Sequence, residues 1–115
     1  MILRGPANVE GQNASNSHGG NGDYFVRTLL TSEFSSKMKY VRELTLMPGA
    51  SIGMHPHVND EEIYYVISGE GIMQVDDEEK PMKMGDIVLT KSGSSHGLKN
   101  SGESDLKIFV ACVVY

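Results

Sequence analysis

Short runs of strand-forming residues, separated by glycine and other turn formers, limit most strongly what this chain of 115 residues can fold into. No window keeps an apolar stripe at helical spacing for three turns, so the sequence offers no long helix. Many short strands in one domain are typical of a sandwich or barrel. The six best strands are Tyr24–Leu30, Tyr40–Met47, Glu62–Ile67, Gly71–Val75, Asp86–Thr90 and Leu106–Val114, and the two weaker ones are Ser51–His57 and His96–Asn100.

A change in composition divides the chain into an arm and a folded domain. Residues 1–22 are rich in Gly, Asn and Ser, and the stretch from Gly11 to Gly22 is expected to be irregular. The strand-forming runs begin at Asp23, so residues 23–115 are predicted to form one domain. Within it, residues 31–37 can hold a single helical turn at most, and residues 76–79 are predicted to be a charged hairpin tip.

Charge and composition exclude several classes of partner. The net charge is −5 and Lys and Arg do not cluster, which argues against the basic face that nucleic-acid binding requires. No apolar run approaches the roughly 20 residues of a membrane helix, and residues 1–11 lack the apolar stretch of a signal peptide. The single cysteine, Cys112, cannot form an intrachain disulfide and is predicted to be a small buried hydrophobe. We therefore expect a cytoplasmic protein with neither a nucleic-acid nor a membrane partner.

Three of the four histidines fall in one spaced pattern with a glutamate. His55 and His57 are followed by Glu62, and His96 comes after a second glycine-punctuated run. Residues two apart on a strand point to the same side, so His55 and His57 can converge on one ion. Three imidazoles and one carboxylate suit Mn, Fe, Co, Ni or Zn. The pattern therefore predicts one divalent transition metal, which can polarise a carbonyl or acidify a water.

The two blocks that carry these residues resemble the two signature motifs of the cupin superfamily. The blocks read Gly49-ASIGM-His55-Pro56-His57-VNDE-Glu62-IYYVIS-Gly69 and Gly85-DIVLT-Lys91-Ser92-Gly93-SS-His96-GLK-Asn100. Lys91 is the one departure, since the family usually has proline there. The resemblance implies an all-β fold, the double-stranded β-helix or jelly roll of a cupin barrel, with one divalent metal bound in its mouth.

The spacing of the first motif leaves a choice between two carboxylates. A three-residue spacer would select Glu61 and a four-residue spacer selects Glu62, and we prefer Glu62 because only it lies six residues before Gly69. On a strand, Tyr64 shares the face of Glu62 and should look into the barrel, whereas Tyr65 should face outward.

Three further residues are candidates for catalysis or substrate binding. Arg42 and Arg27 are two of only three arginines, and either can clamp a carboxylate if it faces inward, although both can equally lie on the surface. Tyr64 is expected to pack in the core unless it serves as a proton donor. His18 lies in the arm and is expected to be solvated, with a role at the site only if the arm folds over the mouth.

The run from Lys37 to Tyr65 is similar to small single-barrel cupins of the oxalate decarboxylase-like type. The similarity implies a metal-dependent enzyme acting on a small carboxylate or another oxygenated metabolite, as a decarboxylase or dioxygenase with the metal as Lewis acid. A non-catalytic binding or sensor barrel is the alternative, and a metal-independent sugar isomerase-like enzyme is a third reading, since a fold alone does not fix a function. The resemblance also implies a homodimer, with Tyr65, Ile67 and the arm as contact elements.

Overall fold

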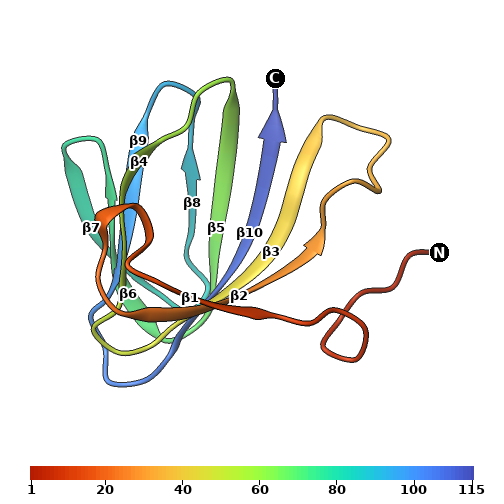
Figure 1. The fold of residues 1–115 in the computed structure, drawn as a ribbon. Helices are drawn as coiled ribbons and strands as arrows, with labels where there is room; N and C mark the ends of the chain where they lie inside the picture. The colour runs from red at the N-terminus through yellow and green to blue at the C-terminus, as the bar shows by residue number, and fades with distance from the viewer.

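The computed structural model describes residues 1–115 and consists almost entirely of β-strands (Figure 1). The elements in chain order are β1 (Gln12–Ser15), the 3-10 turn η1 (Ser17–Gly19), β2 (Asp23–Leu30), β3 (Met38–Leu46), β4 (Ser51–Pro56), β5 (Asp60–Ser68), β6 (Glu70–Val75), β7 (Glu78–Lys83), β8 (Ile87–Thr90), β9 (Ser95–Asn100) and β10 (Leu106–Val114). The prediction of an all-β fold is confirmed. No helix of the protein has the length and apolar character needed to cross a membrane.

The strands form two antiparallel sheets. The larger sheet has the order β1-β2-β3-β10-β5-β8, and the smaller has the order β4-β9-β6-β7. From β3 to β10 the chain alternates between the sheets, apart from the β6–β7 hairpin, which stays in the smaller one. This alternation is that of a jelly roll, as predicted.

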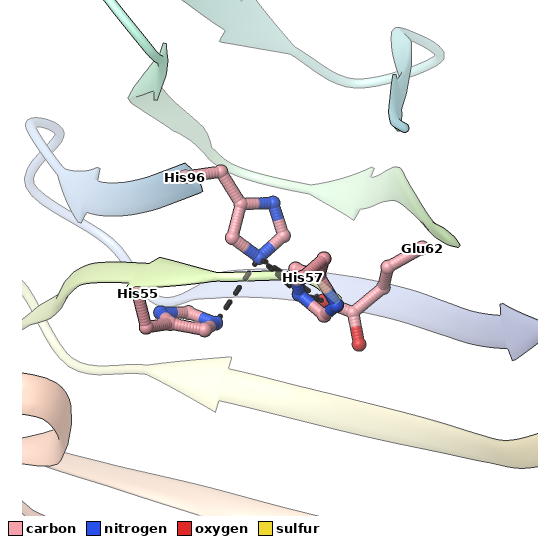
Figure 2. A group of neighbouring side chains, drawn as sticks. All are labelled: His55, His57, Glu62 and His96. Carbon is pink, nitrogen blue, oxygen red and sulfur yellow. Dashed lines mark hydrogen bonds and ion pairs between the residues drawn. The ribbon is translucent and has the colours of Figure 1, made fainter. Parts of the chain in front are cut away.

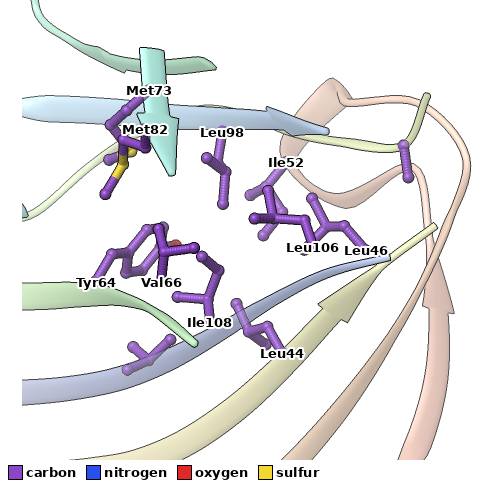
Figure 3. Packing of buried hydrophobic residues seen from close by; sticks show 12 residues of the cluster. Leu44, Leu46, Ile52, Tyr64, Val66, Met73, Met82, Leu98, Leu106 and Ile108 are labelled. Carbon is purple, nitrogen blue, oxygen red and sulfur yellow. The ribbon is translucent and has the colours of Figure 1, made fainter. Parts of the chain in front are cut away.

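The inward faces of the strands change character along the barrel. On β5 the inward residues run from Asp60 and Glu62 to Tyr64 and Val66, and all four are buried. Burial of apolar surface therefore stabilises one end of the barrel, while the other end holds polar groups. Figure 3 shows the apolar end, where the buried residues come from both sheets: Leu44, Leu46, Ile52, Val66, Met73, Met82, Leu98, Leu106 and Ile108.

Two predictions of secondary structure are wrong, one for the hairpin that follows β6 and one for the arm. Strand β7 was not predicted, and Glu78 and Glu79 belong to it, so the hairpin tip shrinks to Asp76-Asp77. β7 is the edge of its sheet and only Met82 is buried along it, so it lacks the apolar alternation that marks a half-buried strand.

The arm is not irregular throughout, because residues 12–15 form β1. This strand pairs with β2 and so becomes the edge of the larger sheet. Residues 17–22 then reach β4, where the backbone N–H of Ser51 donates to the carbonyl of Asn21. In Figure 1 the red arm accordingly runs from β2 to β4. It connects an edge of one sheet with an edge of the other.

Candidate metal centre

The four predicted ligand residues lie together at the polar end of the barrel (Figure 2). His55 is on β4, His57 follows it in the next loop, Glu62 is on β5 and His96 on β9. Nε2 of His96 lies 3.0 Å from Nε2 of His57 and 3.2 Å from Nε2 of His55. Oε1 of Glu62 lies 3.1 Å from Nε2 of both His57 and His96. Glu61 is not part of this cluster.

The other nitrogen of each imidazole is bonded away from the centre. Nδ1 of His55 donates to the Gly53 carbonyl at 2.8 Å, and Nδ1 of His57 donates to Oδ1 of Asp60 at 2.8 Å. Nδ1 of His96 lies 2.7 Å from Oγ1 of Thr90, which can accept its proton. A ring that carries its proton on Nδ1 has a free lone pair on Nε2. Three lone pairs therefore face the common centre.

The spacing of these donor atoms fits one cation. Neighbouring donors at ~2.0–2.2 Å from one ion, and at right angles to each other, lie about 3.0 Å apart. The separations of 3.0–3.2 Å between these nitrogens and oxygen match that arrangement. Without an ion, the lone pairs face each other at short range. The residues present therefore fit a divalent transition metal that can take further ligands.

The charge on Glu62 is stabilised inside the barrel. Burial alone would raise the pKa of this carboxyl, but the close approach of His96 and the hydrogen bond from Tyr40 outweigh burial and hold the pKa below its usual value. Burial also lowers the pKa of His55, which favours the neutral ring that binds metals. Three neutral imidazoles and one carboxylate are the forms in which such ligands coordinate.

A second cluster shares His57 but is less suited to a metal. It consists of His57, Asp60 and Cys112. Asp60 already accepts from His57 and from Nζ of Lys39 at 2.9 Å. Burial raises the pKa of the Cys112 thiol to about 11, whereas a thiol must lose its proton to coordinate. Asp60 is better explained as the partner that orients His57.

A cavity of about 670 Å³ opens beside the site and is lined by His55, His57 and Glu62. Arg42 and Tyr64 both line it, whereas Arg27 does not. The Arg42 guanidinium lies 3.7 Å from the centre of the Tyr40 ring, and its Nε is buried without a hydrogen-bond partner. The Nε of Arg27 is also buried without a partner, but a terminal nitrogen of its guanidinium donates to the Val9 carbonyl at 2.5 Å. Of the two arginines, only Arg42 is placed to meet a ligand.

Sequence reasoning missed three residues that hold the ligands. Tyr40 donates to Glu62, Asp60 accepts from His57, and Thr90 bonds His96. Strand parity was the available signal for two of them, because Tyr40 is two residues from Arg42 and Asp60 two from Glu62.

His18 is close to the site rather than solvated on all sides. Its ring stacks on that of His55, with centroids 3.9 Å apart and planes 14° from parallel, and it lines the cavity. The arm therefore folds over the mouth of the barrel.

Comparison with known proteins agrees with this geometry. The family model described as "Cupin domain" matches residues 42–112. The chain belongs to the cupin family. The oxalate-binding protein of Thermotoga maritima is 35% identical over 115 residues, which cover 99% of this cupin and 93% of that protein.

Solved structures show the same barrel. A crystal structure of a predicted oxalate decarboxylase from Thermotoga maritima superposes with a TM-score of 0.94 at 31% identity. The match covers 99% of this cupin and 100% of that chain. An RmlC-like cupin from Shewanella frigidimarina gives a TM-score of 0.79 at 16% identity, covering 100% of this cupin and 92% of that chain. The second likeness concerns the fold alone.

Proposed function

We propose that this cupin binds a small carboxylate through a divalent transition metal held by His55, His57, Glu62 and His96. The observation that carries the proposal is the bonding of all three Nδ1 atoms away from the centre, which leaves three Nε2 lone pairs beside a carboxylate. Such outer bonds fix ring orientation in metal sites. Mn, Fe, Co, Ni and Zn all suit this donor set.

Arg42 supports a carboxylate as the ligand. It is a cation in the cavity wall, where its guanidinium would pair with a bound anion. Guanidinium groups pair with carboxylates through two parallel hydrogen bonds. The relative named an oxalate-binding protein makes oxalate the first ligand to test.

Catalysis is a second candidate function, favoured by the two tyrosines of the cavity wall. Burial, together with the nearby charge of Glu62, raises the pKa of both Tyr40 and Tyr64, so both phenols keep their protons. A carboxylate that loses CO₂ must gain a proton on the same carbon, and a protonated phenol can supply one. A metal in the site would supply Lewis-acid polarisation of the carboxylate. A decarboxylase or a dioxygenase acting on a small carboxylate is therefore the enzymatic form of the proposal.

Calorimetry with Mn²⁺, followed by oxalate, tests the proposal. Oxalate should bind the Mn²⁺-loaded protein and not the metal-free protein. Arg42→Ala should weaken oxalate binding by about tenfold or more while Mn²⁺ binding is kept, because a charged hydrogen bond contributes about 1.5–3 kcal/mol. Arg27→Ala is the matched control and should match the wild type. The proposal would be contradicted if oxalate bound equally well without the metal, or equally well to Arg42→Ala.

Product analysis separates the two functions. Incubation of the metal-loaded protein with oxalate should return oxalate unchanged if the protein only binds it. Formation of formate and CO₂, slowed in Tyr64→Phe, would establish a decarboxylase instead.

We further propose that the protein is a cytoplasmic homodimer. A single buried cysteine fits a reducing compartment. The dimer is supported by apolar side chains exposed on the outer face of the larger sheet, among them Tyr65, Ile67 and Phe109.

A further inference from the structure

His55 is the least enclosed of the four candidate ligands. It is half-buried, while the exposed fractions of the other three are 6% for His57, 3% for Glu62 and 0% for His96. Its hydrogen bond to Gly53 fixes one edge of the ring, but a ring held at one edge can still tilt. The face of His55 is covered by His18, which supplies no donor atom to the cluster.

The backbone of the arm is docked closely enough to hold His18 in place. The Ser51 N–H donates to the Asn21 carbonyl at 2.6 Å, and the Asn21 N–H donates to Oγ of Ser51 at 2.9 Å. A Cβ on Gly20 would lie 2.2 Å from the Ser51 carbonyl oxygen, so this approach requires glycine. His18 itself has φ 52° and ψ 38°, a left-handed conformation that persists only where the surroundings impose it.

We propose that His18 is a positioning residue, which holds the His55 ring toward the shared centre, so that docking of the arm sets how tightly the barrel holds its metal. The inference rests on the proposed metal site. Stacking against His18 restricts the tilt of the His55 ring, which the hydrogen bond to Gly53 alone does not prevent. The arm thereby links the two sheet edges and restrains the candidate ligand that is most exposed to solvent.

Calorimetric titration of Mn²⁺ into the full-length protein and its variants tests the role of His18. His18→Ala should raise the dissociation constant by about two- to tenfold, the range of an aromatic pair contact. His18→Phe should restore near wild-type affinity, because it keeps the ring and removes both nitrogens. If His18→Phe is as weak as His18→Ala, the stacking role is overturned. If His18→Ala equals the wild type, the inference fails while the metal site stands.

Undocking the arm gives an independent test. Gly20→Ala should weaken Mn²⁺ binding as His18→Ala does, since the added Cβ meets the β4 backbone. Its φ of −74° suits alanine, so the only cost of the change is that contact. Gly5→Ala is the matched control, because no atom lies within 4 Å of its Cβ, and it should bind as the wild type does. Unchanged affinity in Gly20→Ala would overturn the coupling to the arm, and a wild type that binds no Mn²⁺ would overturn the proposed function itself.

Discussion

At the residue scale, the site depends on bonds made by atoms that face away from it. Asp60 is buried and accepts from both His57 and Lys39. Burial alone would raise the pKa of Asp60, but these two hydrogen bonds hold it below the usual value, so the group remains a carboxylate. A charged acceptor on Nδ1 makes the opposite nitrogen a better donor to a metal.

Replacement of Asp60 by alanine should therefore weaken metal binding by about 10- to 100-fold, as for other outer partners of metal-binding histidines. Calorimetry with Mn²⁺ measures the change. Lys39→Ala is the control, because the His57–Asp60 bond survives in it, and a small change is expected there. Equal affinity of Asp60→Ala and the wild type would show that His57 is oriented by other contacts.

Cys112 should be unreactive while the protein is folded. Its side chain is 0% exposed, and burial raises the pKa of the thiol to about 11, so almost none is thiolate at neutral pH. A thiol-modifying reagent should label about one group per chain in denaturant and none in the native protein, as measured by mass spectrometry. Rapid labelling without denaturant would contradict the burial.

At the element scale, the turn between β5 and β6 depends on a glycine. Gly69 has φ +85°, and a Cβ there would lie 2.4 Å from the Asp105 carbonyl oxygen. Gly49 has nearly the same φ, +82°, with nothing within 4 Å of the added Cβ. The two positions differ in crowding and share the same backbone requirement.

Urea unfolding of two alanine variants separates these effects. Gly49→Ala should lower the free energy of unfolding by about 1–2 kcal/mol, the cost of a left-handed conformation with a Cβ. Gly69→Ala should lower it by more, because the Asp105 backbone must also move. If the free energy of unfolding falls equally in the two variants, the loop before β10 moves aside at no cost.

The strands that could be predicted from the sequence are those with runs of apolar or β-branched residues. β5 and β10 carry dense apolar runs because the smaller sheet covers their inner face. β8 is an edge strand that was predicted from its apolar run at residues 87–89, whereas the edge strands β1 and β7 have mostly exposed side chains and carry no apolar pattern. Their pairing depends on backbone hydrogen bonds to neighbours, which composition does not encode.

The candidate site shows the same limit. His55, His57, Glu62 and His96 could be predicted because two motifs fix their spacing along the chain. Thr90 could not, since its contact with His96 depends on how β8 in one sheet faces β9 in the other. Contacts between sheets follow from packing of the whole barrel.

At the scale of the whole molecule, the larger sheet leaves one face without cover. On this outer face, β5, β8 and β10 bring apolar residues into register. Tyr65 lies opposite Phe109 on one side and Ile87 on the other, and Ile63 lies opposite Leu89. Tyr65, Ile87, Leu89 and Phe109 are all exposed. Contiguous apolar patches of this kind mark protein interfaces more often than free surface.

A second copy of the chain on this face would form a homodimer, and Phe109 lies within the patch, directly opposite Tyr65. Wild-type protein should sediment as a dimer, and Phe109→Glu should sediment as a monomer, because a carboxylate in an apolar contact loses its hydration without gaining a partner. Met54→Glu is the control, since Met54 is exposed on the other sheet and the dimer should persist. Metal binding should survive in the Phe109→Glu monomer, because all four candidate ligands come from one chain. A monomeric wild type, or a Phe109→Glu protein that remains dimeric, would remove this face as the interface.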